Sequence, residues 1–149
     1  MIIYIVIFLV ILTLIIIFFK KIKNKQAKIN KIEKGTNYEK QIAKIYENKG
    51  YKVFYNGIAK GKNDEGIDLI AWADDEVILI QCKNHETHIK QSTLKIFYAD
   101  ATMYELKNKA KIKNRKVTKN FVSNSNLNYN AKFWLENNPT QINFIEIKI

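Results

Sequence analysis

Three polar side chains lie where two apolar segments would bring them together. Asp68 stands near the start of the apolar segment 67–73, and Gln81 and Lys83 end the apolar segment 77–83. The residues between these segments favour a turn, so the two form a predicted hairpin of antiparallel strands. In such a pair, the start of the first strand lies beside the end of the second. The spacing therefore predicts that a carboxylate, an amide and an ammonium group converge at one edge of a sheet.

The oxygen atoms of this set could bind a hard divalent cation. Asp68 offers a carboxylate and Gln81 an amide oxygen, and the backbone carbonyl of Cys82 could serve as a third ligand. Because side chains alternate along a strand, the Cys82 thiol is expected to point away from Gln81 and Lys83, into apolar surroundings. Mg²⁺, for which Mn²⁺ could substitute, can polarise a phosphodiester and lower the pKa of an attacking water. Lys83 could orient that water or offset charge in the transition state.

Glu39 has two possible roles that the sequence leaves open. It follows Thr36 at the spacing of a helix capping box, in which the two side chains satisfy backbone N–H groups at a helix start. At 100° per residue it also falls within the apolar arc of the following helix, so it is expected to face inward. A carboxylate there requires a partner, and the predicted metal site would provide one. Glu39 is therefore a candidate further ligand as well as a candidate cap.

Residues 35–149 are expected to form one α/β domain. Gly35 marks its start, and Asp74, Asp75 and Glu76 are expected to form a solvated hairpin tip. Hydrophobic periodicity and turn residues predict the elements in this order: a helix ending at Gly50, strands at 51–56, 67–73 and 77–83, a helix at 89–108, a strand at 117–123, a helix at 129–137 and a strand at 142–147. A glycine-containing loop is expected at 57–66.

The first nineteen residues are expected to form a transmembrane anchor. The stretch 2–19 is almost entirely Ile, Val, Leu and Phe, and eighteen helical residues reach about 27 Å, close to the thickness of a bilayer's hydrocarbon core. No basic residue precedes the stretch, and no small-residue cleavage site follows it, unlike in a signal peptide. The basic linker 20–34 should remain on the cytoplasmic side. We therefore expect a single-pass protein of the cytoplasmic membrane, with its amino terminus outside and its domain in the cytoplasm.

The charge of the chain fits a nucleic-acid partner only mildly. The net charge is +11, of which the anchor and linker carry +6 (seven lysines and one glutamate), leaving +5 for residues 35–149. Arg115 is the sole arginine, so bidentate recognition of guanine by arginine is scarcely available. Cys82 is the sole cysteine, which excludes an internal disulfide and a cysteine zinc cluster. The chain has no phosphate-cradling Gly-x-x-x-x-Gly-Lys-Ser/Thr motif, so no ATP is implied.

Several segments resemble the Mrr-type restriction endonucleases, a branch of the PD-(D/E)xK nuclease superfamily in which Gln replaces the acidic residue before x-Lys. The resemblance lies in residues 35–39, 50–53, 64–70 and 81–83, and more weakly in 121–124 and 131–133. It implies a restriction-endonuclease-like core, metal-dependent cleavage of DNA, and active-site roles for Asp68, Gln81, Lys83 and Glu39. One departure is Glu65, which stands where the family commonly has glycine and is expected to add a charge near the metal.

Two classes of function remain open at this point. The first is a membrane-anchored Mg²⁺-dependent DNA endonuclease, for which cleavage of both strands by one active site per chain would favour a homodimer. The second is a catalytically inactive nuclease-fold module that binds DNA or serves as a membrane scaffold. Around the site, His85 and His88 could be a metal pair or loop residues, and Lys90, Gln91 and Lys95 could contact phosphates or form a solvated helix face.

Overall fold

The computed structural model describes the backbone of residues 2–60, 65–139 and 141–149, and side chains from residue 12 onward within these ranges except at residue 60. Asp64, which is part of the resemblance, lies outside the described residues. The chain divides into two compact units, one ending at Lys34 and the other comprising Gly35–Ile149. Each unit is described by itself below.

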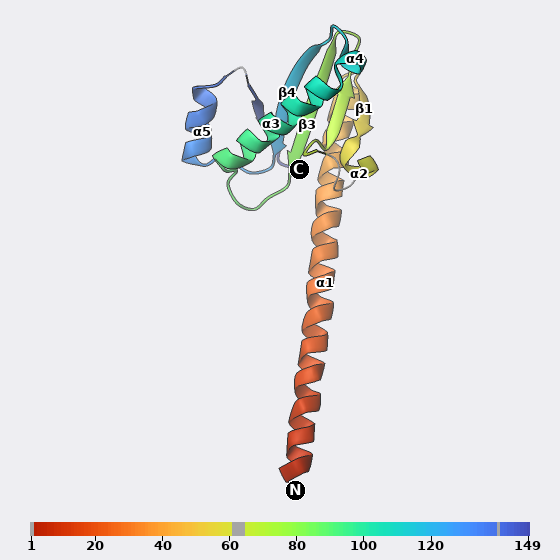
Figure 1. Ribbon diagram of the computed structural model, residues 1–149, viewed down its shortest axis with the longest axis vertical. Coiled ribbons are helices and arrows are strands. Elements are labelled where there is room, and N and C mark those ends of the chain that lie inside the picture. The colour runs from red at the N-terminus through yellow and green to blue at the C-terminus, as the bar shows by residue number, and fades with distance from the viewer. Residues whose placement is uncertain (1, 61–64, 140) are drawn as a thin grey trace. The chain divides into compact units, whose positions relative to one another are not determined.

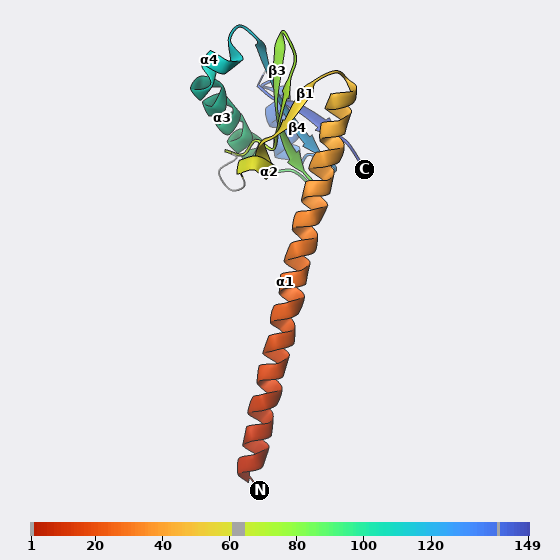
Figure 2. The same cartoon turned by 90° about the vertical axis from the view of Figure 1, so that its right-hand side faces the viewer.

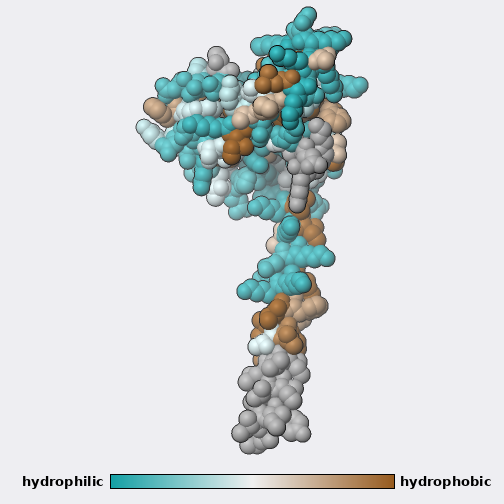
Figure 3. Space-filling view, viewed as in Figure 1, coloured by the Kyte–Doolittle hydropathy of each residue, from teal (hydrophilic) through white to brown (hydrophobic). Residues whose placement is uncertain are grey.

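The described backbone of the first unit is helical throughout and belongs to α1, which spans Ile2–Asn48. Its described apolar side chains are exposed, including Phe18 and Phe19, and Figure 3 shows hydrophobic groups on this helix interrupted by a hydrophilic stretch. Within the described residues, no helix combines the length and apolar character that a membrane span requires. The expected anchor at 1–19 falls largely on residues 1–11, whose side chains lie outside the described part of the chain.

The predicted helix start at Thr36 is wrong. Thr36 and Glu39 both lie inside α1, which continues without a break through Gly35. The preceding residues are mostly good helix formers, and a glycine in a helix interior costs only about 1 kcal/mol. Because a turn of helix already precedes Thr36, the backbone N–H groups that a capping box would satisfy have helical partners. The capping role of Glu39 is therefore excluded.

The second unit is built on a five-stranded mixed sheet with the order β1-β2-β3-β4-β5 (Figure 1). Its strands are β1 Lys52–Tyr55, β2 Leu69–Trp72, β3 Glu76–Lys83, β4 Lys116–Ser123 and β5 Asn143–Glu146. The pairs β1–β2 and β2–β3 are antiparallel, and the pairs β3–β4 and β4–β5 are parallel. The predicted hairpin, the order of the five strands and the mixed α/β class are thus confirmed, whereas the short helices between β1 and β2 and after the long helix of residues 91–107 were not predicted.

The helices are α1, α2 Asn56–Lys60, α3 Gln91–Lys107, α4 Lys109–Ile112 and α5 Tyr129–Glu136. The short helix α2 replaces part of the loop expected at 57–66. Asn56 is fully buried and donates a hydrogen bond from its side chain to the Ile67 carbonyl at 2.8 Å. Gly57 donates its backbone N–H to the Asp68 carbonyl at 2.9 Å. The start of α2 is therefore held by residues about eleven positions away, which local sequence patterns do not reveal.

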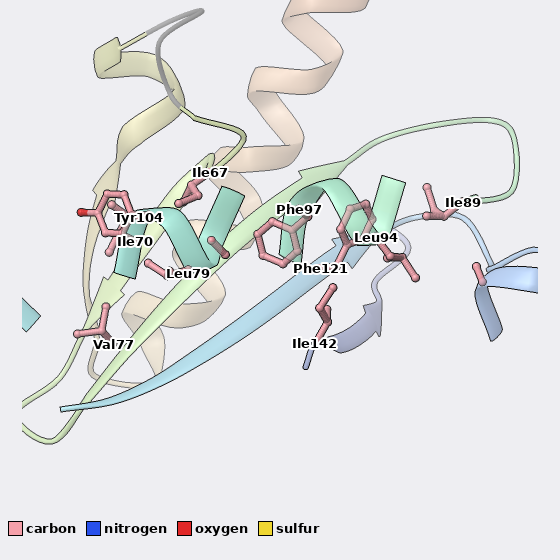
Figure 4. Close-up of a cluster of buried hydrophobic side chains, with 12 residues drawn as sticks. Ile67, Ile70, Val77, Leu79, Ile89, Leu94, Phe97, Tyr104, Phe121 and Ile142 are labelled. Carbon is pink, nitrogen blue, oxygen red and sulfur yellow. The ribbon is translucent and has the colours of Figure 1, made fainter. Parts of the chain in front are cut away.

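Two hydrophobic clusters lie on the two faces of the sheet. Alternate residues of β3 divide between them: Val77 and Leu79 belong to the first cluster, and Ile78 and Ile80 to the second. The first cluster also contains buried residues of α3 and α5, and Figure 4 shows Phe97 of α3 beside Phe121 of β4. The second contains buried residues from the end of α1, and Figure 2 shows this end and α3 on either side of the strands.

Glu76 was expected in the solvated tip of the hairpin but lies in a strand. Asp74 and Asp75 are exposed as expected, whereas Glu76 begins β3 and is half-buried. Its carboxylate accepts hydrogen bonds from the hydroxyls of Thr118 and Tyr51. The Thr118 hydrogen bond, together with the Tyr51 hydrogen bond and the charge of Lys116, lowers the pKa of Glu76 despite its partial burial.

Stability should consequently fall in acid partly through Glu76. A carboxylate whose pKa is lower in the folded protein stabilises the fold above its unfolded pKa, here about 4.5, and this contribution is lost as pH falls through the folded pKa. We expect Glu76→Gln to lose less stability than the wild type between about pH 6 and pH 3 in urea unfolding experiments. The matched control is Asp75→Asn on the exposed tip, which should follow the wild-type profile. Parallel profiles for the wild type and Glu76→Gln would contradict this assignment.

Candidate active site

Asp68 is fixed against the end of β3 by its backbone and its side chain. Its N–H donates to the Ile80 carbonyl at 2.9 Å. Because Ile80 is already the register partner of Leu69, Asp68 lies one residue out of the regular antiparallel pairing. Its carboxylate Oδ2 accepts a hydrogen bond from the backbone N–H of Cys82 at 2.6 Å. The predicted approach of Asp68 to the Gln81–Lys83 segment is therefore present, and a direct contact holds the carboxylate there.

Gln81 and Lys83 are half-buried at the carboxyl end of β3. They follow Leu79 at two and four positions along the strand, so their side chains lie on the same face of the sheet as Leu79, the face of the first cluster. The end of β3 is tied to β4: the Lys83 carbonyl accepts a hydrogen bond from the Ser123 hydroxyl at 3.0 Å and from the Asn124 backbone N–H at 3.3 Å. These neighbours were not among the predicted site residues. Two small polar residues at a strand end form no sequence pattern by which this contact could have been predicted.

Cys82 lies between these residues but faces the second cluster, where it is 7% exposed. Within a strand, the N–H and C=O of one residue point to the same edge. The Cys82 carbonyl therefore lies on the edge where its N–H contacts Asp68, which suits the predicted role of this carbonyl as a ligand.

The pKa of the Cys82 thiol is affected by the charged groups near this end of the sheet. Burial raises its pKa well above the ordinary value, and the nearby carboxylates of Asp68 and Glu39 raise it further, while Lys83 acts in the opposite sense. Glu39 and Asp68 therefore lie within electrostatic range of the same buried atom.

Glu39 reaches this region from the opposite face to Gln81 and Lys83. It is half-buried on α1 beside Tyr38, and both Tyr38 and Ile42 belong to the second cluster. Tyr38 in turn donates a hydrogen bond from its hydroxyl to the Ile147 carbonyl at 2.9 Å. The four predicted residues therefore lie at one end of the sheet, with Glu39 on the face opposite to that of Gln81 and Lys83.

The loop before Asp68 is fixed by a close approach to α3. Gly66 has a φ of +70°, and a Cβ there would lie 2.4 Å from Oδ2 of Asp100, so a side chain would require this contact to change. Glu65 also has a positive φ, 55°, which favours glycine. Its carboxylate pairs with Lys107 at 2.7 Å. The charge expected near the metal is thus engaged by a lysine of α3.

The donor set fits a hard cation rather than a thiophilic one. Among the described residues, no three His, Cys, Asp or Glu side chains are grouped so that they could hold a metal. The set at this site consists of one carboxylate, one amide oxygen and one backbone carbonyl. Mg²⁺ is commonly bound by only one or two carboxylates and keeps several waters, so these residues fit that ion.

One family model and two solved structures are similar to this chain. Residues 30–146 match a family model described as restriction endonuclease, of the Mrr catalytic type (Mrr_cat). The crystal structure of a protein of unknown function, AF1548, has the same fold, with a TM-score of 0.53 and 18% identity over 71% of this chain and 55% of that one. A structure of EndoMS with double-stranded DNA gives a TM-score of 0.49 and 15% identity over 76% of this chain and 45% of that one. The chain thus spans about half the length of each solved structure. No curated protein matches the sequence.

Proposed function

The chain belongs to the Mrr-type family of restriction endonucleases, and we propose that it is a Mg²⁺-dependent endonuclease that hydrolyses phosphodiester bonds in DNA. The observation that carries the proposal is the 2.6 Å hydrogen bond from the Cys82 N–H to the Asp68 carboxylate. It holds a negative charge at the strand end that also bears Gln81 and Lys83, a combination that suits metal-assisted hydrolysis of a phosphodiester.

Each residue has a distinct role in this proposal. Asp68, the Gln81 amide oxygen and the Cys82 carbonyl would hold the cation, which when bound supplies charge stabilisation and a more acidic water. A carboxylate has about four lone-pair sites, so accepting the Cys82 hydrogen bond does not exhaust the capacity of Asp68. Lys83 would position the attacking water and stabilise negative charge that develops on the phosphoryl oxygens.

Glu39 would act from the other face of the sheet. Its position near Cys82 supports a role in holding a water molecule of the cation's hydration shell, rather than direct contact with the scissile phosphate. With helix capping excluded, Glu39 keeps its second predicted role, that of a further oxygen donor to the cation, directly or through water.

We also propose that residues 1–19 anchor the chain in the cytoplasmic membrane, that 20–34 form a basic linker, and that the nuclease domain 35–149 acts in the cytoplasm. The apolar sequence of 2–19 and the seven lysines that follow it support this topology. Cleavage of both DNA strands by one active site per chain would favour two such chains acting together, so a homodimer is part of the proposal. A reporter fused after Ile149 and active only outside the cytoplasm would contradict the topology.

The activity itself is tested with the full chain and supercoiled plasmid DNA. We expect nicking or linearisation in Mg²⁺ or Mn²⁺ and none in EDTA, because the cation supplies several kcal/mol of transition-state stabilisation. Adding Mg²⁺ back to the EDTA-treated protein should restore cleavage. Methylated, unmethylated, branched and single-stranded DNA should be compared, since the choice of target is open. A folded protein that binds DNA but cleaves none of these substrates in either metal would instead be a binding module.

A further inference from the structure

A second polar feature adjoins the candidate active site. A cavity of about 160 Å³ lies immediately beyond Lys83, between the end of β3 and the start of α3. Its polar lining residues are Lys83, His85, Thr87, His88, Lys90 and Thr93. The volume far exceeds the 10–15 Å³ that one ordered water needs, so a group larger than water fits.

The lining chemistry selects for an anion. Two ammonium groups, two imidazoles and two hydroxyls can all donate hydrogen bonds. Of the described residues that line the cavity, none carries a carboxylate. Such a lining favours a group with several acceptor oxygens and negative charge, which is the chemistry of a phosphate.

The loop that forms the cavity is held in place before any ligand binds. The His85 N–H donates to the Asn124 side chain at 2.8 Å, and the Ser125 hydroxyl donates to the His85 carbonyl. Ile89 is 4% exposed, and its N–H and carbonyl are bonded to Asn126 and Asn128 at 2.9 Å each. A ligand would therefore meet a preformed site and lose less free energy to ordering the loop.

The start of α3 adds a favourable electrostatic contribution. Lys90 is the N-cap residue, its side chain makes no capping hydrogen bond, and the first turn contains no acidic residue. Thr93, in that first turn, lines the cavity. The partial positive charge of a helix amino end would thus add to the cationic lining.

We propose that this cavity is a phosphate-binding subsite that holds a DNA phosphate adjacent to the scissile bond. The proposal rests on the proposed function, because Lys83 belongs both to the cavity lining and to the candidate active site. A strand whose phosphate is held here would present the neighbouring phosphodiester to Asp68. The phosphate could be an internal phosphodiester or a 5′-terminal phosphate, since both offer the same oxygen atoms.

The test is equilibrium binding of the full chain to a labelled duplex in EDTA, where metal-dependent cleavage cannot run. Lys90→Ala should weaken binding by up to about tenfold. It should also reduce the slope of log K against log salt by about 1, as the loss of one phosphate contact does. Lys90→Arg should retain the slope. Thr93→Val, which keeps the side-chain shape but loses the hydroxyl, should weaken binding without changing the slope.

Lys109→Ala is the matched control, because it removes the same charge from an exposed residue of α4. We expect it to leave the slope unchanged. Equal effects of Lys90→Ala and Lys109→Ala on affinity and slope would overturn the subsite. A wild-type chain that does not bind DNA at all would instead count against the proposed function.

Duplexes with and without a 5′-phosphate identify the source of the phosphate. If Lys90→Ala weakens both duplexes equally, the subsite holds an internal phosphodiester. If it weakens only the 5′-phosphorylated duplex, the subsite holds a terminal phosphate. Either result supports the proposal, and no effect on either duplex contradicts it.

Discussion

Asp68→Asn is expected to reduce DNA cleavage by about 10³-fold or more while the fold remains intact. The asparagine keeps an oxygen that can accept the Cys82 N–H, as the carboxylate does at 2.6 Å, but it removes the negative charge that would hold the cation. Losing about 4 kcal/mol of the cation's transition-state stabilisation corresponds to this factor, because each 1.36 kcal/mol changes a rate tenfold.

Initial rates of plasmid nicking in Mg²⁺ would measure this effect, alongside Asp75→Asn as the control. Asp75 lies on the exposed hairpin tip, so its substitution makes the same charge change away from the site and should leave the rate unchanged. Asp68→Ala should lose cleavage equally and also destabilise the fold by about 1–3 kcal/mol, because the Cys82 N–H would lose its partner. Lys83→Ala should likewise lose most activity. Wild-type rates in Asp68→Asn would exclude Asp68 from the catalytic machinery.

Phe121→Ala should be the most destabilising of the substitutions considered. Phe121 is fully buried in β4, with its ring centroid 5.8 Å from that of Phe97 and 6.3 Å from that of Phe144. Removing the ring would leave a cavity between α3, β4 and β5 and cost about 3–5 kcal/mol, a large part of the 5–15 kcal/mol that stabilises a typical domain. Since Phe121 pairs with Gln81 in the sheet, activity should fall with stability.

Urea unfolding followed by circular dichroism would measure this loss, and the melting temperature should fall by about 10–20 °C. Phe133→Ala is the matched control, since this phenylalanine is 58% exposed on α5. A surface substitution of this kind should change stability by no more than about 0.5 kcal/mol. Equal losses for Phe121→Ala and Phe133→Ala would show that the rings of Phe97, Phe121 and Phe144 do not form the tightly packed centre of the core.

The placement of Asp68 beside the end of β3 could be predicted because it depends on local signals only. The acidic turn fixes where the two apolar segments reverse direction, and the period of two fixes which side chains share a face. A hairpin then has few possible registers. Asp68 opposite the Gln81–Lys83 segment follows from any register close to the observed one, in which Leu69 pairs with Ile80.

The errors arose where distant residues decide the local structure. The capping-box pattern at Thr36 was overridden by the helix that precedes it. The buried Asn56 holds the start of α2 through a hydrogen bond to Ile67. Glu76 is held in β3, rather than in the exposed turn, by a hydrogen bond from Thr118, 42 residues later in the chain. Hydrogen bonds of this kind join segments that no sequence window contains together. The cavity beyond Lys83 depends in the same way on Asn124 and its neighbours.

The sole cysteine makes this end of the sheet measurable by chemical labelling. The thiolate form of a cysteine attacks a thiol reagent. Because Cys82 is buried and its pKa is raised, its reaction with such a reagent should be slow in the folded protein. Labelling would then proceed through transient opening of the region where β3 meets the end of α1. Because the Cys82 N–H is bonded to Asp68, a cation or DNA strand bound there would oppose that opening. The labelling rate of one native side chain would thus report ligand binding without any attached probe.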